Sequence, residues 1–155
     1  MMKKLLLLLL CLPLIFSCGE KRETNNEEFT KNLEHFKNLV NDINTYFTNS
    51  SLENLEISNY YTEDFIFYSY PAGKKKGIET PKIDYINNLE KMKKMKMSLN
   101  IGHSIYLPGV NEVTFEVDGS VRVYYGSTIS IDTNNVDFSG YQTVDFIDGK
   151  ISAIW

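Results

Sequence analysis

The spacing of the apolar residues changes once along the chain, and this change constrains the fold more than any other feature of the sequence. Between residues 29 and 47, apolar side chains recur every three or four positions, which is the period of an amphipathic helix. From Ser98 onward, apolar and polar side chains alternate instead, which is the period of strands with one buried face. Helices followed by antiparallel strands predict an α+β domain.

Three helices are expected before the alternating region. The first covers residues 27–47. A short second helix is expected after residue 50, because Ser50 and Glu53 have the spacing of a capping box. The third is expected to run from Thr80-Pro81 to about Lys96. Between the second and the third, the aromatic run at residues 60–70 predicts a strand that is covered on both faces.

Turn-forming residues divide the alternating region at four places. These are Pro108-Gly109, Asp118-Gly119, residues 133–135 and Asp148-Gly149. The divisions predict an antiparallel meander of short strands. Gly126 lies inside one of these strands, where a glycine is typical of a bulge or a bend.

The charge balance and the cysteine content narrow the possible functions. The 155 residues include 16 Lys and Arg and 20 Asp and Glu, and this acidic balance argues against nucleic acid as a partner. The two cysteines are Cys11 and Cys18, so the chain after them can form neither a disulfide nor a thiolate nucleophile. The two histidines are far apart, which makes a zinc site unexpected, and the sequence predicts no metal and no cofactor.

The N-terminal segment has the pattern of an export signal. Lys3 and Lys4 precede an apolar run at residues 5–16, which is shorter than the roughly 20 residues of a membrane-spanning helix. The string Ile15-Phe16-Ser17-Cys18-Gly19 resembles the lipobox of bacterial lipoproteins. The resemblance implies cleavage before Cys18 and acylation of this cysteine. The alternative is an ordinary signal peptide with an incidental cysteine.

The lipobox implies three parts and a location. Residues 1–17 are expected to be the lipoprotein signal peptide, residues 18–26 a polar tether that starts at the lipidated Cys18, and residues 27–155 the folded domain. Because two or more acyl chains give lasting attachment, the chain is expected to be anchored to a membrane of the bacterial cell envelope. In a diderm cell this would be the outer membrane.

Several short strings, taken in order, resemble the nuclear transport factor 2-like superfamily. They are Tyr61-Thr62-Glu63-Asp64 at the start of the first strand, Gly77 before a helix, and Asp148-Gly149-Lys150-Ile151 near the end. The SnoaL-like polyketide cyclases and ketosteroid isomerase are similar. The resemblance implies a cone-shaped, curved antiparallel sheet wrapped around three N-terminal helices, with a cavity between them. Members use this cavity for unrelated purposes, so the fold does not determine the function.

The residues before Pro71 argue against isomerase chemistry. Enzymes similar to ketosteroid isomerase place a carboxylate base just before the proline that closes the first strand, whereas Ser69 and Tyr70 stand there in this chain. Neither side chain can remove a proton from carbon near neutral pH. We therefore expect the domain to bind a small apolar ligand or a protein partner without catalysis. The alternative is a SnoaL-like cyclase, isomerase or hydrolase that acts on a small hydrophobic molecule.

The walls of the expected cavity should come from the first strand and the middle strands. The predicted pocket residues are Phe65, Phe67, Ile101, His103, Tyr124 and Tyr141. Alternation places Phe65 and Phe67 on one strand face and Ile101 and His103 on another, while the tyrosines would supply aromatic walls with polar tips. His103 is a candidate general base or hydrogen-bond donor, and the alternative is a satisfied histidine at the edge of the core.

Three further expectations concern the surface. The outer face of the sheet could hold a second copy of the chain in a homodimer. The lysines at residues 74–76 and 91–96 form two clusters that are expected to be solvated, with contact to anionic lipid headgroups as the alternative. His35, which lies beside Phe36 on the first helix, is expected to face solvent.

Overall fold

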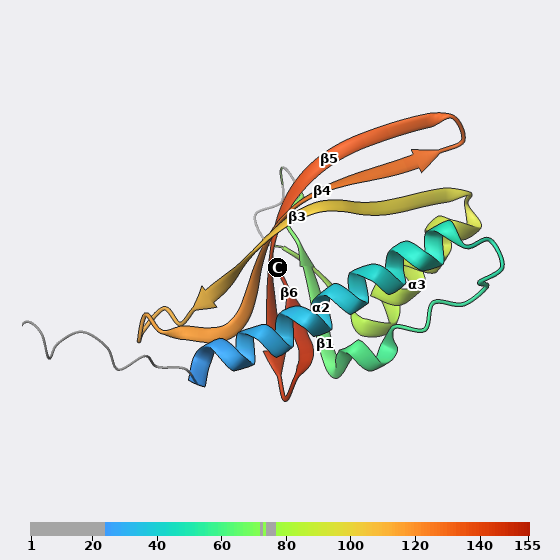
Figure 1. Ribbon diagram of the computed structural model, residues 1–155. Helices are drawn as coiled ribbons and strands as arrows, with labels where there is room; N and C mark the ends of the chain where they lie inside the picture. The colour runs from blue at the N-terminus through green and yellow to red at the C-terminus, as the bar shows by residue number, and fades with distance from the viewer. Residues whose placement is uncertain (1–23, 72, 74–76) are drawn as a thin grey trace, which may run out of the picture.

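The computed structural model describes residues 24–71, 73 and 77–155. The expected signal peptide, Cys18 and most of the tether lie outside these residues. Figure 1 shows two helices against one face of a curved sheet, which confirms the α+β class. Within the described part of the chain, no helix is long and apolar enough to cross a membrane.

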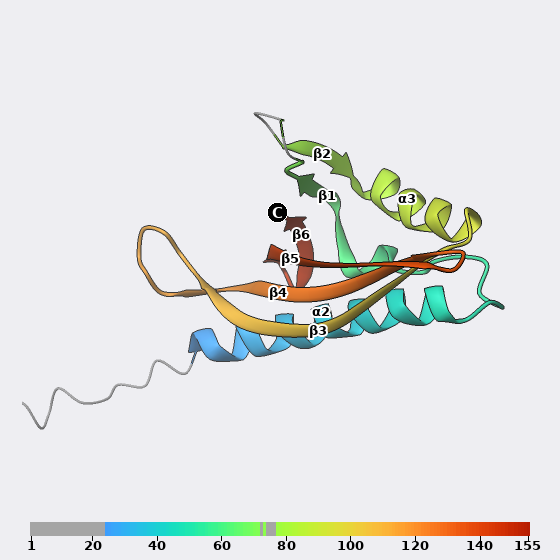
Figure 2. The same ribbon diagram turned by 90° about the horizontal axis from the view of Figure 1, so that it is seen from above.

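The sheet has six strands in the order β2-β1-β6-β5-β4-β3. The strands are β1 (Tyr61–Ser69), β2 (Ile78–Pro81), β3 (Met97–Val110), β4 (Val117–Ile131), β5 (Asn134–Ile147) and β6 (Lys150–Ile154). β1 and β6 pair in parallel and the other neighbours pair antiparallel, so the sheet is mixed rather than wholly antiparallel. The long strands β3, β4 and β5 curve as they run past the helices (Figure 2), and this curvature leaves a concave inner face.

The helix α2 (Thr24–Thr48) is the amphipathic helix that the apolar spacing predicts. Its buried apolar side chains are Phe36, Leu39, Ile43, Tyr46 and Phe47, which share the side that packs on β3 and β4. The helix begins three residues earlier than expected. Residues 24–26 therefore belong to α2 and not to the tether.

The expected second helix after residue 50 is absent from the described chain, and this prediction is wrong. Residues 51–57 form a loop that leads into a single 3-10 turn, η1 (Ser58–Tyr60). Leu55 and Ile57 are both buried while Glu56 is exposed, so the burial there follows a period of two. One capping box does not outweigh the cost of nucleating so short a helix.

The helix α3 (Lys82–Lys94) confirms the expected third helix. The Lys93 ammonium on its last turn donates to the carbonyls of Tyr46, Asn49 and Leu52, the last two at 2.8 and 2.7 Å. Tyr46 lies in the last turn of α2, where helix carbonyls lack partners within the helix, and Asn49 and Leu52 lie in the loop that follows. Lys93 is therefore a cap for α2 and not a member of a solvated cluster.

Two of the four expected turns lie inside strands. Pro108 pairs with Val121, and β3 continues to Val110. β3 is an edge strand, and proline is tolerated in edge strands. Gly119 lies within β4 at φ +79°, a left-handed conformation that suits glycine.

The real turn between β3 and β4 falls at residues 111–116, where a short strand was expected. Asn111 N donates to the Glu116 carbonyl at 2.8 Å and closes the turn. The expected hairpin at Asp148-Gly149 is confirmed between β5 and β6. Both of these residues have positive φ, as a tight two-residue hairpin turn requires.

A β-bulge in β3 decides which side chains reach the inner face. Ile101 pairs with Ser127, but the next pair is Ser104 with Tyr125, so β3 spends one extra residue at Gly102-His103. The extra residue reverses the alternation from that point onward. The bulge is in β3, whereas the sequence pattern indicated Gly126 in β4.

Candidate functional site

A cavity of about 200 Å³ lies between the two helices and the concave face of the sheet. Helix α2 supplies Phe36, Leu39, Val40 and Ile43, and α3 supplies Tyr85 and Leu89. The apolar part of the sheet wall consists of Phe67, Leu99, Ile101, Val123, Phe138 and Ile154. The polar part consists of Ser104, Tyr125, Ser127 and Gln142.

The local structure explains why these side chains meet. The four lining residues of α2 follow the pattern i, i+3, i+4, i+7, and Tyr85 and Leu89 are four positions apart, so each set lies on one side of its helix. Val123, Tyr125 and Ser127 alternate along β4 and therefore point to the same face. Asn44 then joins α2 to β3, since its amide donates to the Ile101 carbonyl at 2.9 Å and accepts from Ile101 N at 2.8 Å.

The position of the Tyr125 ring depends on a glycine. Tyr125 pairs with Gly140 across β4 and β5, and a Cβ placed on Gly140 would lie only 2.4 Å from Cζ of Tyr125. The ring therefore lies directly over Gly140. The Tyr125 ring also meets Phe138 edge to face, with 6.3 Å between the ring centroids. A larger residue at 140 would push the Tyr125 ring away.

The lining residues are electrically neutral. None of those on the described chain is Asp, Glu, His, Lys or Arg. Burial raises the pKa of Tyr85 to about 12 and also raises the pKa of Tyr125, so both phenols keep their protons at neutral pH. Among the described residues, the buried hydroxyl of Ser127 has no hydrogen-bond partner. The cavity thus offers apolar walls and neutral hydroxyl groups.

The structure brings only part of the predicted pocket together. Phe67 and Ile101 line the cavity. Phe65 is on the same face of β1 but belongs to the packed core, at 1% exposure, with its ring centroid 4.3 Å from that of Tyr61. The remaining three predicted residues do not reach this space.

His103, Tyr124 and Tyr141 lie on the outer face of the sheet, so the prediction that they share a pocket with Phe67 is wrong. His103 is exposed and borders a separate shallow hollow with Thr128 and Asp137. The reason is the bulge, which points His103 away from the face of Ile101. The Tyr124 and Tyr141 rings lie 4.8 Å apart and are each about half exposed.

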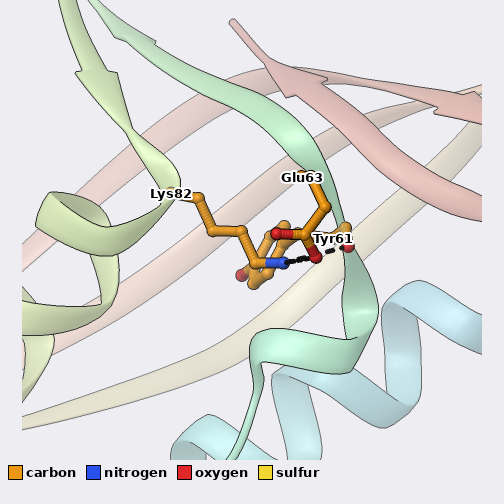
Figure 3. Close-up of polar contacts among 3 residues, drawn as sticks. All are labelled: Tyr61, Glu63 and Lys82. Carbon is orange, nitrogen blue, oxygen red and sulfur yellow. Dashed lines mark hydrogen bonds and ion pairs between the residues drawn. The ribbon is translucent and has the colours of Figure 1, made fainter.

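Lys82, Glu63 and His35 make their polar contacts away from the residues that line the cavity. Figure 3 shows Lys82, at the start of α3, directed at Glu63 and at the Tyr61 carbonyl, with 2.9 Å between Lys82 Nζ and Glu63 Oε1. The hydrogen bond and charge of Lys82 lower the pKa of Glu63. His35 was expected to face solvent, but it is half-buried and its Nε2 donates to the Tyr60 carbonyl at 3.1 Å.

Metal ligands are not grouped in the described part of the chain. No three residues of the types His, Cys, Asp or Glu come together there in a way that could hold an ion. Arg122, on the outer face, donates to the Thr143 hydroxyl at 2.6 Å. Ser69 and Tyr70, the residues that precede Pro71, do not line the cavity.

Sequence reasoning missed the residues that give the cavity its polar character. Tyr85 had a usable signal, because it lies four residues before Leu89 and so extends the apolar side of α3. The signal at Gly140, a glycine inside a strand, was weaker. Ser127 and Gln142 had no signal, since a small polar residue on a strand is typical of a solvated face.

No protein-family model and no curated protein matches this chain. Solved structures do resemble it. An LEH-like epoxide hydrolase from M. tuberculosis has a TM-score of 0.55 at 14% identity, covering 81% of this chain and 80% of its own. An NTF2-like protein from Anabaena variabilis has a TM-score of 0.56 at 13% identity, covering 80% and 86%. A phenazine biosynthesis-related protein from Pseudomonas aeruginosa has a TM-score of 0.55 at 14% identity, covering 85% and 81%.

The chain has the nuclear transport factor 2-like fold. The likeness extends over about four fifths of each chain, and it confirms the fold that the short sequence strings implied. At 13 to 14% identity it concerns the fold alone. The function must be argued from the cavity and from the surface of this chain.

Proposed function

We propose that this chain is a lipoprotein of the bacterial cell envelope whose SnoaL-like domain binds a small, uncharged, mostly apolar molecule without transforming it. The observation that carries the proposal is the neutral lining of the 200 Å³ cavity. General acid–base catalysis needs a side chain that can exchange a proton near neutral pH. Two phenols with raised pKa and two serines do not supply one.

The size and polarity of the cavity define the class of ligand. A cavity of about 150 Å³ lined by apolar side chains is known to hold benzene, so 200 Å³ suits a molecule of about one aromatic ring. A charged ligand would lose its hydration without gaining an ion pair, which is costly. The unpartnered Ser127 hydroxyl favours a ligand with one hydrogen-bonding group.

Binding can be tested with toluene and phenol, which have nearly the same size and differ by one hydroxyl group. Titration of the purified chain with toluene should shift the methyl NMR signals of Leu39, Leu89 and Val123, which line the cavity. The methyl signals of Val113, which is 85% exposed in a distant turn, should stay in place. The absence of saturable shifts at the lining methyl groups for both compounds would overturn the binding function.

The role of Ser127 is tested by the ratio of the two dissociation constants. In Ser127→Ala, the affinity for phenol relative to toluene should fall about two- to tenfold, the usual net worth of one hydrogen bond. Ser104→Ala is the matched control, because Ser104 also lines the cavity but its hydroxyl already contacts the Gly102 carbonyl. An equal change in both variants would show that the effect is not specific to Ser127.

The alternative function is a SnoaL-like enzyme that acts on a small hydrophobic molecule. The named epoxide hydrolase among the similar structures favours this class. Incubation of the purified chain with a small apolar epoxide such as styrene oxide would reveal diol formation above the uncatalysed rate. Turnover that is lost in Tyr85→Phe or Tyr125→Phe would replace the binding proposal by the enzyme.

The membrane anchor is proposed from the lipobox string. Cys18→Ser should leave an unprocessed precursor that takes up no fatty acid during metabolic labelling. Ser17→Ala, which keeps a small residue before the cut, should still be labelled. Fatty-acid labelling of the Cys18→Ser variant would show that the lipoprotein assignment is wrong.

Self-association through the outer face of the sheet is a second proposed interaction. Ile105, Leu107, Tyr124 and Tyr141 are each about half exposed and lie side by side across β3, β4 and β5. An exposed apolar patch of this kind is typical of a protein interface. Sedimentation equilibrium should detect a dimer that Tyr124→Lys weakens and that Val136→Lys, at another exposed apolar position, leaves intact.

A further inference from the structure

The turn between β3 and β4 presents the two most exposed large apolar side chains of the described domain. Val113 and Phe115 are 85% and 80% exposed. The turn itself is well defined, because Phe115 N donates to the Asn111 carbonyl at 2.9 Å and the Asn111 side chain accepts from Val113 N at 2.9 Å. Two large apolar groups are thus held in water on a structured tip, which is typical of a surface that contacts another molecule.

This tip lies at the same end of the molecule as the start of α2. Asn32, in the third turn of α2, donates to the Gly119 carbonyl at 3.0 Å, and a Cβ on Gly119 would lie 2.9 Å from the Glu28 side chain. Figures 1 and 2 both show the β3–β4 turn beside the first turns of α2, and the β4–β5 turn at the opposite end. The base of the tip is therefore fixed to the part of the helix that follows the tether.

The length of the tether brings a lipid anchor within reach of the same surface. Only five residues separate Cys18 from the start of α2 at Thr24, and the six chain steps between the two Cα atoms span at most about 20 Å when extended. A bilayer that holds the acyl chains of Cys18 would then lie close to the tip. The charges near the tip limit the kind of bilayer, since Glu112 and Glu116 flank the apolar pair and would be repelled by anionic lipids.

We infer that the Val113-Thr114-Phe115 tip docks into the surface of a zwitterionic lipid bilayer and orients the anchored domain on it. The inference rests on the proposed acylation of Cys18. With the tip in the bilayer, the β4–β5 turn and the lysine-rich end of α3 point away from the membrane. If the lysine-rich end contacted anionic headgroups instead, the domain would have the opposite orientation on the membrane.

The test places a fluorescent label at one end of the domain or at the other. Because the acylated chain has no other free cysteine after Cys18, Thr114→Cys and Thr133→Cys each give a single site, one at the tip and one at the far β4–β5 turn. The lipidated protein is reconstituted in phosphatidylcholine vesicles that contain a lipid-borne nitroxide quencher. We expect strong quenching of the label at 114 and at least fivefold weaker quenching at 133.

Combining the label at 114 with Val113→Ser and Phe115→Ser should reduce its quenching at least twofold, since the apolar contact with the lipid is lost. The melting temperature should stay unchanged, because neither side chain is packed on the domain. Flotation of the vesicles with equal or absent quenching at both sites would overturn the docked tip and leave the lipid anchor standing. Failure of the protein to float with the vesicles would overturn the anchor and the tip together.

Discussion

Separate replacement of Phe65 and Phe67 by alanine tests whether the cavity is an open space in solution. Both residues lie on the same face of β1, two positions apart, so the backbone effects of the two substitutions are alike. Phe65 is 1% exposed, and its ring centroid lies 4.3 Å from that of Tyr61 and 5.5 Å from that of Tyr85. Removal of a ring packed on all sides costs about 3–5 kcal/mol of unfolding free energy.

Phe67→Ala should lower the unfolding free energy less than Phe65→Ala, because one side of the Phe67 ring already faces the cavity. The ring is half-buried, borders the 200 Å³ space and lies 5.1 Å from the Tyr85 ring centroid. Alanine there enlarges an existing cavity and removes fewer packed contacts than alanine at 65. If about half of the Phe67 ring is packed against other side chains, its removal should lower the unfolding free energy by about 1.5–2.5 kcal/mol.

Urea unfolding followed by the fluorescence of Trp155 measures both values. Trp155 is the single tryptophan of the chain and stacks on Tyr68 with 3.9 Å between the ring centroids. The free energy of unfolding should fall about twice as much for Phe65→Ala as for Phe67→Ala, with similar m-values. Equal losses of 3 kcal/mol or more would mean that the space beside Phe67 is filled in solution and is no open cavity.

Three further substitutions test the contacts that shape the domain. Lys93→Met should lower the unfolding free energy by about 1–3 kcal/mol in a urea titration, because three carbonyls lose a charged donor. Lys91→Met is the control at an exposed position and should change the unfolding free energy by less than about 0.5 kcal/mol. Gly140→Ala should push the Tyr125 ring into the cavity, lower the unfolding free energy by about 1–3 kcal/mol and weaken toluene binding. Gly126→Ala is the control and should change neither stability nor binding, because its Cβ would lie 4.0 Å from the nearest atom. Glu63→Gln should lower the melting temperature at pH 7. Lys82 lowers the pKa of Glu63 below its usual 4.5, so the ion pair stabilises the folded state fully above pH 4.5 and loses this effect as the pH falls through the lowered pKa. The difference in melting temperature should therefore disappear in acid.

The parts of the fold that could be predicted are those where one pattern repeats over many residues. The apolar stripe of α2 continues for about five turns, and the aromatic run of β1 has no competing interpretation. Short signals failed where a long-range contact was stronger. Pro108-Gly109 has the composition of a turn, yet Pro108 is tolerated at the sheet edge, and Gly109 is required because a Cβ there would lie 1.8 Å from the Ser120 hydroxyl oxygen.

The side of the sheet on which His103 lies could not be predicted because it depends on a single extra residue in β3. Before the bulge, Leu99 and Ile101 face the cavity, and after it Ser104 and Tyr106 take the same side, so an uninterrupted alternation places His103 and Ile105 on the wrong face. Hydrophobicity gives no warning, since apolar residues occupy both faces of this strand. Gly102 is the one local signal of a bulge. The bulge can be recognised only when Ile101 is known to pair with Ser127 and Ser104 with Tyr125. The face on which a strand residue lies is therefore a property of the pairing with the next strand, and functional residues on strands are the ones that a single sequence is least able to assign.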